Sequence, residues 1–219
     1  MFKKIIISIF LILLLCGGYV AYILYQKVYQ PNVTLANVSD KYFYIYSTYD
    51  FNDVANDLYE QGFIINRESF VWLADKKANF KNNIHPGKYL LKEGMNNNEL
   101  IDLLRSGKQV PVKVTFNNVR TINELIGKLS RNLECDSVEL YDLLTDKAFV
   151  ESYGFNRITI LTLFLPNTYE FNWNTSAEEV IVRMATEYKK FWTDERKEKA
   201  KKLNLSQSEV AILASIVQA

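Results

Sequence analysis

Cysteine and histidine are scarce in this sequence of 219 residues, and their scarcity excludes several kinds of site. One cysteine, Cys16, lies inside an apolar run, and the other, Cys135, lies far away in polar sequence. Two such cysteines cannot form a disulfide framework or a cysteine-rich metal site. The single histidine, His85, argues against a histidine-based metal site or catalytic triad. We therefore expect neither a metal nor a cofactor.

An excess of charge of one sign is also lacking. The sequence has 26 basic and 25 acidic residues, and the part without Lys3, Lys4 and Lys27 has 23 basic residues against 25 acidic ones. No basic surface for nucleic acid is expected from this balance. Because 48% of the residues are apolar and 23% are charged, the chain can form a core, and it is neither disordered nor collagen-like.

The longest apolar run lies near the N-terminus, at residues 5–25. Its 21 residues contain no charge, and at 1.5 Å per residue a helix of this length spans the roughly 30 Å of a bilayer core. Lys3 and Lys4 precede the run, which places residues 1–4 in the cytoplasm by the positive-inside rule. The run therefore predicts a single transmembrane helix with the body of the protein outside.

Two other interpretations of this run remain. A cleaved signal peptide would have an apolar core of about 7–15 residues and a small-x-small site, whereas this run continues past Gly17 and Gly18. A lipoprotein signal is the second, because residues 13–16 resemble a lipobox, but Leu15 stands where a small residue should be.

The body has two parts after an expected linker at residues 26–40. Residues 41–107 predict a small module of order β-α-α-β followed by one more helix, which is a usual size for a domain. The expected strands are residues 42–46 and 86–91, and the expected helices follow Asp50, Asn66 and one of residues 96–98, with Gly62 and Gly107 ending the first and the third.

Residues 108–219 predict a second, mixed domain, so the overall fold class is α+β. Residues 110–116 alternate between apolar and polar side chains and predict a half-buried strand, with Pro111 marking an edge. Helices are expected at about 121–133 and 137–144, and capping boxes at residues 175–178 and 206–209 are expected to open two more.

The last of these helices is unusual because residues 210–217 are apolar except for Ser215. A helix that is apolar on all sides must be buried on all sides. We therefore expect the chain to be the N-terminal portion of a longer protein, or a partner chain to cover this helix.

Several motifs in the body resemble the membrane-anchored endolytic murein transglycosylases, the YceG-like or MltG-type family. Residues 58–66 with Phe70 and Trp72, residues 85–89 and residues 103–107 resemble the first module of that family. Residues 164–170 (FLPNTYE) resemble a family loop that usually reads F-x-P-D-T-Y, and residues 213–217 (LASIV) resemble the start of its catalytic-helix motif, A-S-I-V-x-x-E-T.

The resemblance implies a LysM-like first module and the start of a mixed α/β catalytic domain. It implies an enzyme of the bacterial inner membrane that cleaves nascent peptidoglycan glycan strands, leaves 1,6-anhydro-muramoyl ends and limits strand length. Its partners would be glycan strands, the membrane and the cell-wall synthesis machinery, with no nucleic acid. The motif places the catalytic glutamate immediately after Ala219, so we expect no catalytic residue and no activity in the chain as given.

The expected substrate-binding residues are Asn167, Tyr169, Glu170 and Gln218. Asn167 stands where the family commonly has an aspartate, and Gln218 stands where many members have the first glutamate of E-x-E. Tyr169 either stacks on a sugar ring or packs in the core. Residues 166–169 are expected to form a loop, and Glu170 beside it either contacts substrate, is solvated or caps a backbone group.

Two other protein classes fit the sequence as well. A non-catalytic, membrane-anchored peptidoglycan-binding or scaffold protein would need no glutamate. A eukaryotic type II glycoprotein would explain the four N-x-S/T triplets, at Asn32, Asn37, Asn174 and Asn204, although such triplets arise often by chance in an Asn-rich chain.

Overall fold

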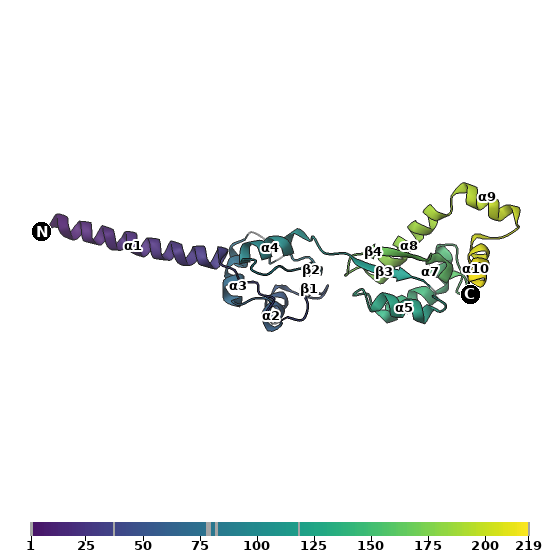
Figure 1. The fold of residues 1–219 in the computed structure, drawn as a ribbon, viewed down its shortest axis with the longest axis horizontal. Helices are drawn as coiled ribbons and strands as arrows, with labels where there is room; N and C mark the ends of the chain where they lie inside the picture. Colours follow the sequence, from purple (N-terminus) through teal and green to yellow (C-terminus); the bar gives the residue numbers. More distant parts are fainter. Residues whose placement is uncertain (1, 37, 78–79, 82, 118, 219) are drawn as a thin grey trace. The chain divides into compact units, whose positions relative to one another are not determined.

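The computed structural model describes residues 2–36, 38–77, 80–81, 83–117 and 119–218, with only the backbone of residues 2–5 and 218. The chain divides into two compact units, residues 1–110 and 111–219, which are drawn in Figure 1. The boundary at Val110 falls three residues after the expected one. The mixed α+β class, with a long apolar N-terminal helix and small two-stranded sheets, is confirmed.

The first unit contains the long N-terminal helix and a β-α-α-β module followed by a fourth helix. Its elements are α1 (Phe2–Tyr29), β1 (Tyr42–Ile45), α2 (Phe51–Glu60), α3 (Arg67–Lys76), β2 (Gly87–Leu90) and α4 (Asn97–Ser106). Strands β1 and β2 are antiparallel, with Tyr42 opposite Leu90 and Ile45 opposite Gly87.

Local capping explains why the helices of this module begin where the sequence predicted. The Asp50 carboxylate accepts hydrogen bonds from the amides of Asn52 and Asp53, and the Asp53 carboxylate accepts from the Asp50 amide. Asn66 and Asn96 cap α3 and α4 in the same position. Gly107 ends α4 at φ 63°, a left-handed conformation that a side chain would strain.

The core of the first unit lies between the helices and one face of the β1–β2 sheet. Phe43 and Ile45 of β1 and Tyr89 of β2 are fully buried there, together with residues of all three module helices. The Tyr89 hydroxyl donates to the His85 carbonyl at 2.7 Å, and burial raises the pKa of this tyrosine to about 12. The alternate residues Tyr42 and Tyr44 are only half-buried.

Residues 26–40, which were expected to be a linker, are partly folded into the first unit. Helix α1 continues to Tyr29, and Val28 packs against the module core. Asn32 and Val33 are buried, and Val33 forms an isolated antiparallel bridge with Ile64. The segment therefore joins α1 to the module through packed contacts.

A buried carboxamide connects three segments of this unit. Asn97, which is 1% exposed, donates to the Lys27 carbonyl at 2.9 Å and to the Ser69 hydroxyl at 2.9 Å. Its own oxygen accepts from the Asn32 side chain at 2.7 Å. Asn32 in turn makes two hydrogen bonds to the backbone of Asn66. The end of α1, the start of α3 and the start of α4 thus meet at one polar network.

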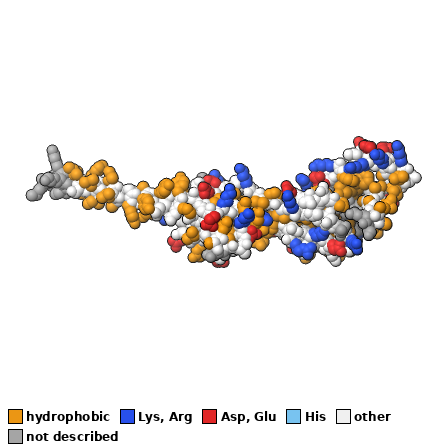
Figure 2. Space-filling model, in the orientation of Figure 1, with side chains coloured by type: hydrophobic (Ala, Val, Ile, Leu, Met, Phe, Trp, Pro, Cys, Tyr) orange, Lys and Arg blue, Asp and Glu red, His pale blue; other side chains and the backbone are white. Residues whose placement is uncertain are grey.

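Helix α1 is long and apolar enough to cross a membrane. The stretch that qualifies is Ile6–Tyr29, its side chains are not buried in the protein, and a signal sequence would pass the same test. Figure 2 shows hydrophobic side chains along this helix.

The second unit contains a two-stranded antiparallel sheet with helices packed on one face. Its elements are β3 (Val112–Phe116), α5 (Ile122–Ser130), α6 (Ser137–Thr145), α7 (Lys147–Ser152), the 3-10 helix η1 (Ile160–Leu163), β4 (Asn167–Phe171), α8 (Ala177–Phe191), α9 (Asp194–Lys202) and α10 (Gln207–Gln218). Val112 lies opposite Phe171 and Phe116 lies opposite Asn167.

The core of this unit is built on one face of the β3–β4 sheet. Val114, Phe116, Tyr169 and Phe171 are buried on that face and join one cluster with apolar residues of α5, α6 and α8. On the other face, Thr115 and Thr168 share a hydrogen bond of 2.8 Å. The apolar stripe of α8, which comprises Ile181, Met184, Ala185, Tyr188 and Trp192, is buried in this core.

Two local predictions for the second unit need correction, and one helix was not predicted. Residues 167–169 belong to strand β4 and not to a loop, because they pair with β3. The capping box of α8 is formed by Ser176 and Glu179, one residue later than predicted. The charged helix α9, in which only Ala200 is buried, was not predicted at all. The box at residues 206–209 is confirmed by reciprocal hydrogen bonds between Ser206 and Glu209.

We predict that Asn97→Ala weakens the first unit. Removing this carboxamide leaves the buried partners Asn32 and Ser69 with unmet hydrogen bonds, which costs about 2 kcal/mol. Amide hydrogen exchange in α3 and α4 should accelerate by about 30-fold. The control is Asn98→Ala, which loses one hydrogen bond to Asp102 and should cost less than about 0.5 kcal/mol. Equal effects of the two substitutions would contradict the role given to the buried network.

Candidate active site

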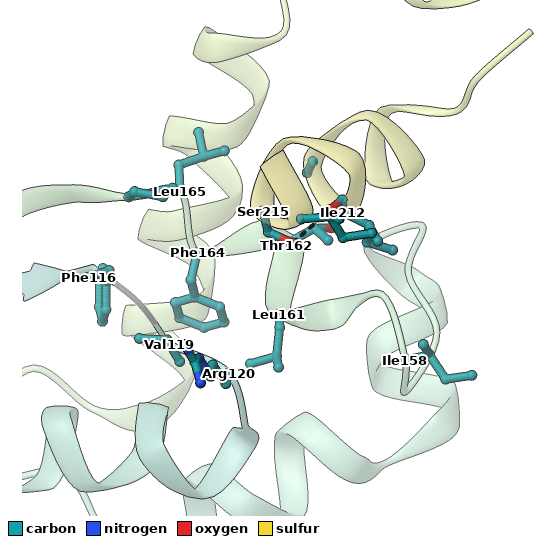
Figure 3. A pocket seen from close by; sticks show the side chains of 13 residues that line it. Phe116, Val119, Arg120, Ile158, Leu161, Thr162, Phe164, Leu165, Ile212 and Ser215 are labelled. Atoms are coloured by element: carbon teal, nitrogen blue, oxygen red, sulfur yellow. Dashed lines mark hydrogen bonds between the residues drawn. The ribbon is translucent and has the colours of Figure 1, made fainter. Parts of the chain in front are cut away.

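A groove of about 690 Å³ lies in the second unit between α10 and the sheet. We call it the α10 groove. Its lining comes from the end of β3 and the loop after it, from η1 and the turn into β4, and from the exposed side of α10, as Figure 3 shows. The residues are Phe116, Val119, Arg120, Ile158, Leu161, Thr162, Phe164, Leu165, Pro166, Ala211, Ile212, Ser215 and Ile216.

Aromatic packing holds one side of this groove. The Phe116 ring meets the ring of Phe164 edge-on at 5.6 Å between centroids, and it lies 5.6 Å from the ring of Tyr169. The Tyr169 hydroxyl donates to the Leu165 carbonyl at 3.1 Å. Burial is the main cause that raises the pKa of Tyr169, and the nearby Glu187 carboxylate adds to it. Tyr169 therefore supports the groove from the core.

The other side of the groove is helix α10. Thr162 of η1 donates to the Ser208 hydroxyl at 3.2 Å, which holds the first turn of α10 against the rest of the unit. Further along, Ile216 is 66% exposed and Val217 is 82% exposed. The expected all-round burial of this helix is therefore not present in the described part of the chain.

The groove is lined mainly by apolar side chains, together with the hydroxyl groups of Thr162 and Ser215 and one charge. Arg120 is the charged side chain among its described lining residues, and no carboxylate lines it in that part of the chain. Glu209, which caps α10, accepts a hydrogen bond from the Ser206 amide, and this bond lowers its pKa. A carboxyl group buried among the apolar side chains and away from Arg120 would instead have a raised pKa and keep its proton near neutral pH.

The predicted substrate-binding residues do not form one cluster. Tyr169 is 8% exposed and faces the core, whereas Glu170 lies on the opposite face of the sheet, because neighbouring strand residues alternate. Glu170 is paired with Lys113, directly across the strands, at 3.8 Å. Asn167 is exposed beside the groove residue Pro166, and its side chain accepts from the Thr168 amide. The side chain of Gln218 lies outside the described residues.

Five of the groove residues, Val119, Arg120, Ile158, Leu161 and Thr162, lie outside the segments that the sequence analysis singled out. The η1 residues Leu161 and Thr162 carry no periodic pattern, since a single 3-10 turn is too short to show one. Arg120 was not considered in the sequence analysis. Its position just before the Thr121 cap of α5, where its amide donates to the Glu124 carboxylate, is the available signal.

Comparison with known proteins identifies the class. A model of the YceG-like family matches residues 43–219, so the chain belongs to the YceG-like family. This is the family of endolytic murein transglycosylases that the motifs resemble.

One solved structure can be set beside the chain. It is the crystal structure of a yceG-like protein from Listeria monocytogenes, with 19% sequence identity and a TM-score of 0.41. The match covers 77% of this chain and 60% of that one, so the chain spans less than two thirds of the relative's length. No curated protein matches the chain.

Other chemistry-bearing groups lie apart from the groove. Within the described ranges, no group of three or more His, Cys, Asp or Glu side chains is placed to hold a metal ion. Cys135 is buried in the core of the second unit, and burial raises its pKa to about 11. A thiol with this pKa is neutral at physiological pH and is a poor nucleophile.

We predict that Cys135 resists alkylation in the folded protein. With a pKa of about 11, only about one thiol in a thousand is ionised at pH 8, so reaction with iodoacetamide should be roughly a hundred-fold slower than in urea. The native rate should rise as the pH approaches that pKa. Peptide mass spectrometry separates this cysteine from Cys16. Equal native and denatured rates at pH 8 would contradict the burial of the thiol.

Proposed function

We propose that this chain is the membrane-anchored N-terminal portion of an endolytic peptidoglycan transglycosylase. The full enzyme would cleave nascent glycan strands within the chain, leave 1,6-anhydro-muramoyl ends and so limit strand length. The observation that carries this proposal is the family match over residues 43–219, which includes the α10 groove.

The groove offers the setting that such a reaction needs. A transglycosylase must protonate the glycosidic oxygen as the bond breaks, and an apolar environment keeps a carboxyl group protonated for this step. The 6-hydroxyl of the muramoyl residue then attacks the anomeric carbon in place of water, and the carboxylate left by the first step accepts its proton. One acid/base residue can therefore serve where hydrolases use two carboxylates. We propose the glutamate expected after Ala219 as this group, next to the apolar wall formed by α10.

The glycan would lie along the α10 groove. Asn167 is adjacent to Pro166 and pairs with Phe116, both of which line the groove, and this supports its role as a substrate contact. We propose Gln218 as a second substrate contact because it lies two positions before the expected catalytic glutamate. Tyr169 would act as a positioning residue through Leu165. Glu170 could contact the substrate only if the glycan strand also reaches the outer face of the β3–β4 sheet.

The first module would add affinity for the wall. Its β-α-α-β order and the two helices packed on one face of a two-stranded sheet support the LysM-like assignment. Weak binding to peptidoglycan by this module would keep the enzyme near new strands, where the cell-wall synthesis machinery works.

A non-catalytic peptidoglycan-binding or scaffold protein is the second candidate. The observation in its favour is that no described carboxylate lines the α10 groove. A measurement of 1,6-anhydro ends, which only the enzyme would produce, separates the two functions.

The anchoring of α1 in the inner membrane is part of this proposal. A signal peptidase site must be extended and accessible, whereas α1 is helical without a break from Phe2 to Tyr29. The hydrogen bond from Asn97 to the Lys27 carbonyl also builds the last turn of α1 into the folded unit. Both features support a retained anchor over a cleaved signal.

We predict that the 219-residue chain lacks transglycosylase activity and that a version including the native residues encoded after Ala219 has it. The missing general acid alone should cost about 10²–10⁴ in rate. Both proteins are incubated with uncrosslinked glycan strands, and 1,6-anhydro ends are measured by mass spectrometry.

Two variants of the longer version serve as controls. Replacement of the expected glutamate by glutamine should abolish anhydro ends, while Glu170→Gln tests the outer face of the sheet. Equal product from the short chain would show that the catalytic residue lies within these 219 residues, and inactivity of the longer version would favour the scaffold function.

We also predict that residues after α1 face away from the cytoplasm, because Lys3 and Lys4 precede the span. Alkaline phosphatase, which is active only outside the inner membrane, should be active when fused after Gln30. A green fluorescent protein fusion at the same position should be dark. The reverse pattern would disprove the orientation.

A further inference from the structure

The last turn of α1 is docked on the first module. Two contacts fix it: the Lys27 carbonyl accepts from the buried Asn97 side chain at 2.9 Å, and the Lys27 ammonium lies 5.2 Å from the centre of the Trp72 ring. Val28 packs against the module core beside them. In Figure 1, α3 and α4 lie at the end of α1, where these contacts occur.

This docked turn follows the apolar span without an intervening linker. The charge-free run ends at Tyr25, and Lys27 comes two residues later, which is about 3 Å along a helix axis. A module fixed to Lys27 must therefore lie at the level of the lipid head groups if the span fills the bilayer core.

The side chains at this junction are those that suit a membrane interface. Tyr22, Tyr25 and Tyr29 are exposed on the final turns of α1, with the rings of Tyr25 and Tyr29 5.0 Å apart. Tyrosine and tryptophan favour the head-group region because their rings are apolar and their polar atoms can hydrogen-bond there. Trp72 is half-buried and comes from the module, not from the span.

Lys27 adds a charge that the protein does not neutralise. No carboxylate in the described part of the chain lies within ion-pair distance of its ammonium group, which is positioned over the Trp72 ring. A cation held over an aromatic ring at this depth is placed to meet lipid phosphate groups.

We propose that the first module rests on the outer surface of the membrane as a rigid extension of α1, with Lys27 and Trp72 in contact with lipid head groups. This proposal depends on the membrane anchoring of α1 proposed above. The partner is the bilayer surface itself. The module is held at a fixed height and orientation above the lipid and does not swing on a tether.

The experiment uses Trp72 as its own depth probe. The full chain carries Trp173→Phe and Trp192→Phe, so that Trp72 is the single tryptophan, and it is placed in nanodiscs of phosphatidylcholine and phosphatidylglycerol. Trp72 emission is compared between ordinary lipids and lipids brominated at shallow acyl positions. We expect clear quenching by the brominated lipids.

A flexible insertion then separates the module from the span. Gly-Ser-Gly-Ser between Tyr25 and Gln26 keeps the docked turn on the module but lets the module move away by about 11 Å. We expect quenching to fall by about half or more. The matched control places the same four residues between Val110 and Pro111, at the boundary of the two units, and should leave quenching unchanged.

The outcomes distinguish this proposal from the anchoring on which it depends. A chain that fails to copurify with nanodiscs disproves the anchoring, and both proposals fall. A chain that copurifies without quenching of Trp72 overturns the head-group contact alone. Undiminished quenching after the insertion at Tyr25 overturns the rigid coupling, since the module would then reach the lipid independently.

Discussion

A buried carboxamide that has to satisfy its hydrogen bonds away from water organises the first unit. Asn97 has two N–H donors and one oxygen acceptor, and all three functions are used by Lys27, Ser69 and Asn32. Because an unpaired buried amide costs about 1–3 kcal/mol, these partners cannot separate independently. These hydrogen bonds therefore hold three segments in one arrangement: the last turns of α1, the first turn of α3 and the start of α4. The sheet and α2 complete the rest of the unit.

Features with local causes were predictable from the sequence. The N-caps at Asp50 and Asn66 and the left-handed glycine at Gly107 depend on side chains within a few residues, so each could be read without knowledge of the fold. Strand β4 was missed because its pairing with β3 joins residues more than fifty positions apart. Helix α9 was missed because its residues are nearly all charged, and a helix without an apolar stripe has no periodic signal.

The candidate site was predictable only in outline. The motif around residues 164–170 identified the right part of the chain, but treating it as a loop grouped Tyr169 with Glu170, which alternate across the sheet. The aromatic support by Phe116 and Phe164 and the contact of η1 with α10 arise from tertiary packing. The prediction of a linker at residues 26–40 was partly wrong for the same reason. The burial of Asn32 depends on partners far along the chain, which the local sequence does not show.

Helix α1 is continuous up to the turn that is docked on the first module. The number of residues in α1 therefore determines how the module is rotated about the helix axis. Every residue of an α-helix contributes about 100° of rotation and about 1.5 Å of rise. One residue added within the span would turn the unit by about 100° around the helix axis. Seven added residues, close to two full turns, would restore nearly the same facing at a height about 10 Å greater. The number of residues in α1 thus sets the rotation of the module about the helix axis as well as the thickness of membrane that the helix spans. A hydropathy profile reports only the spanned thickness.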